Sequence, residues 1–281
     1  MRFANVKGRA SVLAGDRVVD VEQASGGRFG ADPMIAIRQW DAFRSWAQGV
    51  AGTGGEPVLS NVDLGPPVPR PSKVFGIGMN YREHAREAGL DVPGSPVVFT
   101  KFPNCLSGAR ADVPLGSDFV DWEVELVVVI GRRGRRIAAS AALEHVAGYC
   151  VGQDISDRKM QFADRPPQFS MGKSADGYGP VGPALVSLDT FANPDDLAIS
   201  CSISGESVQS ARTSDMIFSV AELIAFLSGV CTLEPGDLIF TGTPAGVGST
   251  RDPRRYLKAG EVIESTIEGI GALVNRCVAA S

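Results

Sequence analysis

The sequence has 281 residues, of which 44% are apolar and 21% are charged, and its net charge at pH 7 is −5. These values are typical of a globular protein with one large core, or with one core and a small additional domain. An acidic chain with one short basic run offers no broad surface for nucleic acid, and no apolar run is long enough to span a bilayer. We therefore expect a cytoplasmic protein with reduced cysteines and with no nucleic-acid or membrane partner.

Residues 1–70 are predicted to form a small N-terminal domain that ends in a proline-rich linker. Apolar-rich runs at 10–14 and 17–21 are separated by a Gly-Asp turn signal, which predicts a hairpin. Apolar and aromatic residues recur at helical spacing over 35–46 and predict a helix there. Four prolines within 65–71 predict an extended connection, because proline fixes its own φ and disfavours helix in the preceding residue.

Residues 71–281 are predicted to form a strand-dominated α+β domain. Helical character is confined to 80–89, 138–145 and 219–228, where Asn80 is placed as the N-cap and Gly89 as the stop of the first helix. Short apolar runs between Gly, Pro, Asp and Asn residues predict strands at 73–77, 96–100, 123–130, 184–186, 197–203, 238–241 and 262–267.

Acidic residues begin the most apolar of these strands. Asp121, Glu123 and Glu125 alternate with apolar residues and therefore share one face of the strand, which is apolar on both faces beyond Glu125. Buried, adjacent carboxylates need a compensating cation, and a hard divalent ion such as Mg²⁺ or Mn²⁺ suits oxygen ligands. Asp154 follows the next strand and would complete a set of three. Solvated acids at a frayed strand end explain the pattern of the strand equally well.

The other polar motifs are individually weak. His84 and Glu87 lie three residues apart on the first helix and so share a face, as in a general-base pair, but an exposed charged helix is the simpler interpretation. Arg158, Gln161 and Lys173 are donors that suit anionic oxygens, and they suit an ordinary surface as well. The Gly-rich turn around Thr243 lacks the Gly-Lys-Ser/Thr ending of a phosphate-binding loop.

Seven segments, in order along the chain, together resemble the fumarylacetoacetate hydrolase family. The segments are GIGMNYREHAREAG (76–89), PVVFTKFPN (96–104), DWEVELVVVIG (121–131), GYCVGQDISDRKMQ (148–161), GKSADGYGPVGP (172–183), LEPGDLIFTGTPAGVG (233–248) and YLKAGEVIESTIEGIG (256–271).

This resemblance implies a mixed β-roll catalytic domain, a homodimer and a complete active site. Glu123, Glu125 and Asp154 would bind one divalent cation per chain, Mg²⁺ or Mn²⁺. His84 and Glu87 would form a base dyad on a mobile, lid-like segment.

For the substrate, the resemblance implies that Lys173, with Arg158 and Gln161 nearby, stabilises an oxyanion and that Thr243 contacts the carboxylate. Gln153, where Asn is commoner, and the segment 176–178 depart from the family pattern and bear on substrate choice.

The implied function is hydrolysis of a carbon–carbon bond in a 2,4-diketo acid, either an acylpyruvate or a sugar-derived diketo acid. The cation would act as a Lewis acid toward the 2-keto acid, and His84 would activate water for attack on the distal carbonyl. The alternative is an oxaloacetate decarboxylase or an isomerase of unsaturated 2-keto diacids, which would use the same site without water attack.

Overall fold

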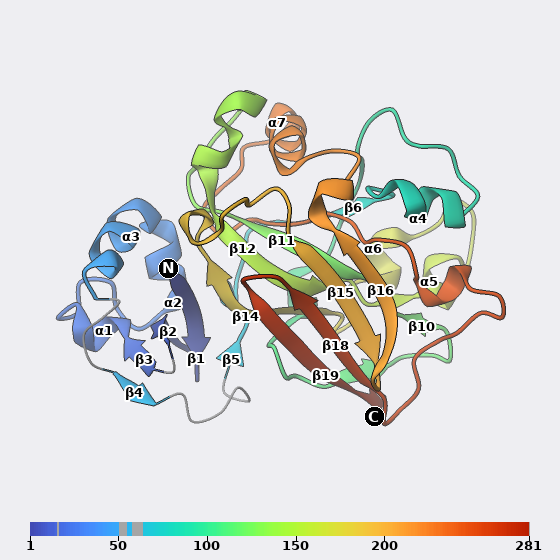
Figure 1. The fold of residues 1–281 in the computed structure, drawn as a ribbon, viewed down its shortest axis with the longest axis horizontal. Coiled ribbons are helices and arrows are strands. Elements are labelled where there is room, and N and C mark those ends of the chain that lie inside the picture. Colours follow the sequence, from blue (N-terminus) through green and yellow to red (C-terminus); the bar gives the residue numbers. More distant parts are fainter. Residues whose placement is uncertain (16, 51–54, 58–63, 281) are drawn as a thin grey trace.

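The computed structural model describes residues 1–15, 17–50, 55–57 and 64–280, and strands dominate it (Figure 1). Its largest sheet has twelve strands, ten of them in the order β4-β3-β2-β1-β14-β12-β11-β17-β6-β7, with β5 beside β1 and β8 beside β14. A five-stranded sheet has the order β16-β15-β18-β19-β9, and β10 pairs with β13. The strand-dominated α+β fold expected from the sequence is confirmed.

The strands of the large sheet are β1 (Arg2–Val6), β2 (Arg9–Ala14), β3 (Arg17–Asp20), β4 (Glu56–Pro57), β5 (Leu64–Gly65), β6 (Val74–Gly78), β7 (Val97–Thr100), β8 (Leu106–Ser107), β11 (Val124–Ile130), β12 (Val146–Gln153), β14 (Gly179–Val186) and β17 (Leu238–Phe240). The others are β9 (Val113–Leu115), β10 (Val120–Asp121), β13 (Ser156–Asp157), β15 (Ala198–Ile203), β16 (Glu206–Arg212), β18 (Val262–Ile267) and β19 (Gly271–Ala279).

The α-helices are short. They are α1 (Val21–Ala24), α2 (Pro33–Arg38), α3 (Trp40–Gln48), α4 (Arg82–Glu87), α5 (Arg158–Gln161), α6 (Phe169–Gly172) and α7 (Val220–Val230). Turns of 3₁₀-helix occupy Pro103–Cys105, Ala139–His145, Leu188–Thr190, Thr213–Asp215 and Gly248–Thr250. Among the described residues, no helix has the length and apolar character needed to cross a membrane.

Strand β11 is buried on both faces, as the sequence predicts. Leu126 and Val128 belong to the core shared with the five-stranded sheet, whereas Val127 and Val129 belong to a second core that includes Trp40 of α3. The antiparallel pairing of β11 with β12 places the beginning of the first strand beside the end of the second. This register brings the acidic residues around both strand ends to one position at the edge of the core.

The hairpin between β2 and β3 is confirmed by its antiparallel pairing, although residue 16 in its turn lies outside the described residues. Gly65, the first residue of the predicted proline-rich linker, belongs with Leu64 to strand β5, which pairs with β1. Strand β1 also pairs with β14, so the N-terminal strands continue the large sheet formed by strands of residues 71–281. A domain boundary after residue 70 stays a prediction.

Three local predictions are corrected. The helix predicted over 35–46 is two helices, α2 and α3, separated at Gln39, which has φ −114°. In the segment 138–145, residues Ala139–His145 form 3₁₀-helix rather than the predicted α-helix. The N-cap of α4 is Tyr81, not Asn80.

Asn80 does not cap the helix because its side chain has tertiary partners. Its Oδ1 accepts a hydrogen bond from the Phe218 amide, and its Nδ2 donates to the carbonyls of Phe218 and Thr241. Gly89 has φ +67° and follows the end of α4, which confirms the predicted helix stop.

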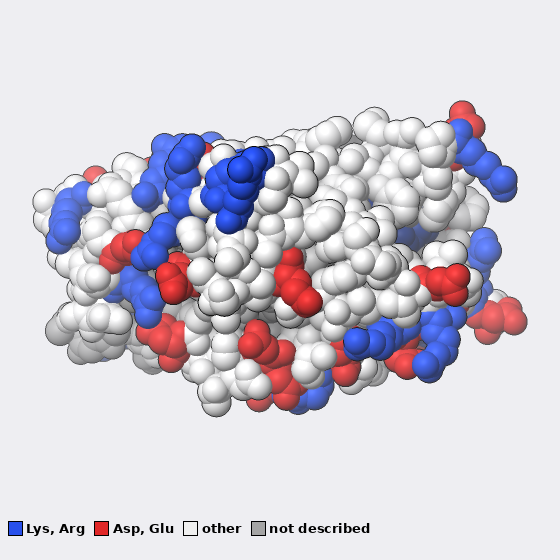
Figure 2. All heavy atoms as spheres, turned by 90° about the horizontal axis from the view of Figure 1, so that it is seen from above, with Lys and Arg blue, Asp and Glu red and all other residues white. Residues whose placement is uncertain are grey.

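Charged side chains of both signs are interspersed on the face of the molecule in Figure 2, with broad uncharged areas between them. All five cysteines are free, and four of them are buried.

Candidate active site

The three predicted metal ligands lie together. Glu123 immediately precedes β11, Glu125 is its second residue, and Asp154 follows β12; all three are buried. Carboxylate oxygens of the three residues lie within 4.8 Å of one another. The register of β11 and β12 produces this cluster, because Glu125 pairs with Gly152 and the Asp154 amide donates to the Glu123 carbonyl.

The electrostatics of the cluster fit a divalent cation. Burial raises the pKa of Glu125 well above its ordinary value, and the charges of Asp154 and Glu123 raise it further. Burial also opposes ionisation of Glu123, but the charges of Lys173 and Arg158 outweigh it and lower the pKa of Glu123 to about 2. The site thus holds more carboxylate than its own cations neutralise, and its donors are all oxygens, which is the set that Mg²⁺ and Mn²⁺ prefer.

Two lysines lie against the cluster. The Lys173 Nζ donates to Glu123 Oε2 at 2.8 Å, to Asp154 Oδ2 at 2.7 Å and to the Ser156 hydroxyl at 2.8 Å. The Lys101 Nζ donates to Asp154 Oδ1 at 2.6 Å and to the backbone carbonyls of Lys173 and Tyr178. Each ammonium group therefore uses its three protons within the protein. Burial disfavours the charged form of Lys173, yet the neighbouring carboxylates raise its pKa overall.

Arg158 links the cluster to a further buried carboxylate, that of Asp121. Its Nε donates to Asp121 Oδ2 at 2.9 Å, one terminal nitrogen donates to Glu123 Oε1 at 2.6 Å, and the other donates to Gln161 Oε1 at 2.9 Å. Asp121 also accepts from the amides of Gly248 and Ser249, so it joins this arginine to the loop after β17. The predicted single strand with Asp121, Glu123 and Glu125 on one face is corrected, because Asp121 ends β10, a separate strand that pairs with β13, and its carboxylate pairs with Arg158.

His84 and Glu87 form the predicted pair. The His84 Nδ1 lies 2.7 Å from Glu87 Oε1, and the Gly246 amide donates to Glu87 Oε2 at 2.9 Å. Burial raises the pKa of Glu87, but the hydrogen bonds from His84 and Gly246 lower it overall. An ionised Glu87 can only accept, so Nδ1 is assigned a proton, and in the neutral ring Nε2 is then the nitrogen that can accept one.

Thr243 is held by its own hydrogen bonds. Its hydroxyl donates to the Val124 carbonyl at 2.9 Å and accepts from Gln209 Nε2 at 2.8 Å. The Gln209 Oε1 accepts from the Val124 amide, so this buried glutamine of β16 connects the Thr243 turn to the strand that carries the acids. The hydroxyl proton is already used, and a substrate carboxylate would have to displace the Val124 carbonyl to receive it.

The departures from the family pattern lie outside the cavity lining. Gln153 Oε1 accepts from the Glu123 amide at 2.9 Å, and its Nε2 donates to Ser265, so Gln153 supports a cluster residue from behind. The Asp176 side chain accepts from Asn104, and the Tyr178 hydroxyl accepts from the Gly116 amide.

A cavity of about 330 Å³ is lined by five of the six predicted catalytic and substrate-binding residues, the exception being Glu87. His84, Arg158, Gln161, Lys173 and Thr243 line it, together with Glu123 of the cluster. Glu87 does not line the cavity but is hydrogen-bonded to His84, which does. The cavity therefore joins the base dyad to the carboxylate cluster.

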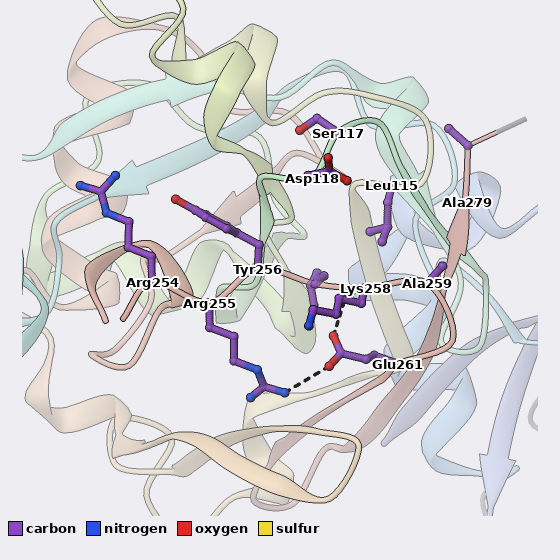
Figure 3. Close-up of a pocket in the computed structure, with 12 residues that line it drawn as sticks. Leu115, Ser117, Asp118, Arg254, Arg255, Tyr256, Lys258, Ala259, Glu261 and Ala279 are labelled. Atoms are coloured by element: carbon purple, nitrogen blue, oxygen red, sulfur yellow. Dashed lines mark hydrogen bonds and ion pairs between the residues drawn. The ribbon is translucent and has the colours of Figure 1, made fainter. Parts of the chain in front are cut away.

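A larger cavity, about 730 Å³, lies elsewhere (Figure 3). Arg254, Arg255, Tyr256 and Lys258 line it, and Arg255 pairs with Glu261 at 3.2 Å. None of the predicted site residues lines this cavity. By size alone, this cavity would be the candidate active site. The acids, cations and histidine that converge on the smaller cavity make the smaller one the better candidate.

Sequence reasoning missed Lys101 and Gln209. Lys101 stands in the segment PVVFTKFPN that carried part of the resemblance, but a single lysine after a short strand has no local signal of burial. Gln209 lies on β16, in a segment that matched no motif.

Comparisons with known proteins agree with the resemblance. The family model described as "Fumarylacetoacetate (FAA) hydrolase C-terminal" matches residues 73–278. The protein named oxaloacetate tautomerase FAHD2A, mitochondrial, of Bos taurus is 45% identical over 226 residues, which are 79% of this chain and 72% of the bovine chain.

Two of the similar solved structures that cover the whole chain bear on its function. One is a Mycobacterium smegmatis protein assigned provisionally as HpcE, with a TM-score of 0.96, 48% identity and 100% of both chains covered. The other is maleylpyruvate hydrolase from Sphingobium sp. SYK-6 in complex with manganese(II) ion and pyruvate, with a TM-score of 0.83, 27% identity and 100% of both chains covered.

Proposed function

The chain belongs to the fumarylacetoacetate hydrolase family, a family of enzymes, and we propose that it is an isomerase that interconverts the keto and enol forms of a small 2-keto acid. The observation that carries this proposal is the His84–Glu87 dyad, which faces the same cavity as the buried carboxylate cluster. The bovine relative, 45% identical, is named an oxaloacetate tautomerase, which supports an isomerase over the hydrolase expected first from the sequence.

In the proposed mechanism, His84 transfers the proton. Its Nε2 removes a proton from the carbon next to the keto group, and the electron pair moves toward the keto oxygen. The same nitrogen then delivers the proton to that oxygen, and the reverse path converts enol to keto. Glu87 holds the ring in orientation and stabilises the imidazolium that forms in between.

Glu123, Glu125 and Asp154 would hold the divalent cation. Bound there, Mg²⁺ or Mn²⁺ would supply Lewis-acid stabilisation of the negative charge that develops on the keto oxygen. Arg158 and Lys173 keep the Glu123 carboxylate ionised, and Arg158 also orients it; Thr243 and Gln161 bound the space for the substrate. Manganese in the Sphingobium structure supports this choice of cation for the present chain.

The second candidate is the carbon–carbon hydrolase. The maleylpyruvate hydrolase similarity, at 27% identity, supports it, since His84 Nε2 could equally remove a proton from water beside a distal carbonyl. Oxaloacetate decarboxylation, which needs no base at all, is the remaining alternative.

Assembly and location stay proposals. A homodimer is expected from the family alone. The sequence led us to expect a cytoplasmic location. The name of the bovine relative places that protein in mitochondria, which supports a different location.

The test follows the enol absorbance of oxaloacetate after it is added in its enol form to Mn²⁺-loaded protein. We expect decay of the enol band well above the rate with Mn²⁺ alone, with no loss of total oxaloacetate, and loss of that acceleration in His84→Ala. A rate equal to that of Mn²⁺ alone, together with release of pyruvate from an acylpyruvate, would replace the isomerase with the hydrolase.

A further inference from the structure

The active-site cavity has a charged inner end and an apolar outer end. Glu123, Arg158 and Lys173 at the inner end are buried. Toward the mouth, Leu90, Val97 and Phe162 line the cavity and are 59%, 41% and 56% exposed. Large apolar side chains that are this exposed and line one cavity indicate a surface that a ligand covers.

Two aromatic rings continue this apolar surface inward. Phe99 of β7 and Phe169 of α6 both line the cavity, with ring centroids 5.7 Å apart and planes tilted by 35°. The Lys173 Nζ lies 5.2 Å from the centre of the Phe99 ring. The apolar surface thus begins directly beside the cluster of charges and extends to solvent.

No cation is left for a second carboxylate of the substrate. Among the described residues that line the cavity, the lysine and arginine side chains are those of Lys173 and Arg158. Lys173 already pairs with Glu123 and Asp154, and Arg158 with Asp121 and Glu123. A carboxylate lying against this partly exposed apolar surface would lose some of its hydration without gaining a counter-charge, which is unfavourable.

We infer that the preferred substrate is a 2-keto acid with an uncharged aliphatic or aryl tail, so that the carboxylate next to the keto group carries its only negative charge. The tail lies against Leu90, Val97, Phe99 and Phe162. This inference rests on the proposed function for the inner end of the site. Oxaloacetate has no such tail, so it should bind more weakly than such a keto acid while still undergoing the reaction. Each methylene that the wall buries should tighten binding by roughly fourfold.

The test compares two ligands of matched shape by calorimetry on Mn²⁺-loaded protein. In 2-oxoglutarate the far end is a carboxylate, and in 5-methyl-2-oxohexanoate an isopropyl group replaces it. We expect the second ligand to bind about tenfold or more tightly than the first. Equal binding, or tighter binding of 2-oxoglutarate, would overturn the inference.

This measurement is independent of the turnover test. If oxaloacetate enol decay is not accelerated, the proposed function fails whatever the two ligands do. If it is accelerated but the dianion binds better, the tail assignment alone fails.

A charge substitution at the mouth gives a second measurement. Leu90→Lys supplies the missing cation, and we expect it to reverse or abolish the preference between the two ligands. Val230→Lys is the matched control, because Val230 is an apolar residue 71% exposed at the end of α7 and does not line the cavity. An unchanged preference in Leu90→Lys, or the same shift in both variants, would count against a tail-binding role for this wall.

Discussion

The Nζ atom of Lys101 lies 2.6 Å from Oδ1 of Asp154, and neither side chain has any solvent-exposed surface. This ion pair joins the loop after β7 to the end of β12 and fixes one carboxylate of the cluster from behind. The same ammonium group donates to the Lys173 carbonyl, so Lys101 also positions the second lysine of the site.

Replacing Lys101 by Met should therefore destabilise the protein. Loss of one partner of a buried pair leaves Asp154 without a counter-charge on that side, which costs about 3–5 kcal/mol. The free energy of unfolding in urea, measured on metal-free protein, checks this. Lys258→Met is the control, because Lys258 is exposed and its side chain makes no ion pair in the described structure. Similar unfolding midpoints for both variants would show that Lys101 has little structural role.

Removing one carboxylate should release the cation. We expect Glu125→Gln to weaken Mn²⁺ binding by more than tenfold, because the cluster loses one of its three charged ligands. Chelator treatment of the unmodified protein should abolish turnover, and Mg²⁺ or Mn²⁺ should restore it. The measurement is the Mn²⁺ dissociation constant by calorimetry, with Glu144→Gln as an exposed acidic control. Full activity in metal-free protein would remove the cation from the function.

The sequence predicted the carboxylate cluster better than it predicted the surroundings. Alternation in Glu123–Ile130 indicated a buried strand that starts with acids, and burial on both faces confirms it. The alternation of acidic and apolar residues did not by itself decide between a metal site and solvated acids. Nothing in the local sequence shows that β11 and β12 pair in the register that brings Asp154 to Glu123. The resemblance supplied that link.

Residues whose roles depend on distant partners were missed or misassigned. Asn80 is a residue type that is common at helix N-caps, yet its side chain donates a hydrogen bond to the carbonyl of Phe218, 138 positions away. Lys101 reaches Asp154 across 53 positions, and Gln209 reaches Thr243 across 34. Such contacts follow from the pairing of whole strands, which short motifs do not encode.

Lys173→Met should affect turnover and cation binding together. Lys173 uses its three protons on Glu123, Asp154 and Ser156, so its positive charge beside the cavity would stabilise the negative charge that develops on the substrate. Loss of such stabilisation costs roughly 10²–10³ in rate. The structure adds a second effect, because Lys173 bridges Glu123 and Asp154. We expect kcat to fall at saturating Mn²⁺ far more than KM rises, and the metal content of each sample must be checked. A raised KM with unchanged kcat would make Lys173 a substrate-binding residue only.

His84→Ala separates the reactions that this site could perform. Keto–enol interconversion and hydrolysis both need a base, whereas decarboxylation of oxaloacetate needs only a chelated substrate and a route for carbon dioxide to leave. Removal of a general base typically costs about 10²–10⁴ in rate. We therefore expect His84→Ala to slow enol decay by that order while oxaloacetate decarboxylation changes much less. Glu87→Gln should act in the same direction more mildly, because Glu87 orients the ring and transfers no proton itself. The measurements are the two rates for each variant, at full metal content. Equal loss of both rates in His84→Ala would mean that the histidine is structural, and unchanged enol decay would exclude it from the mechanism.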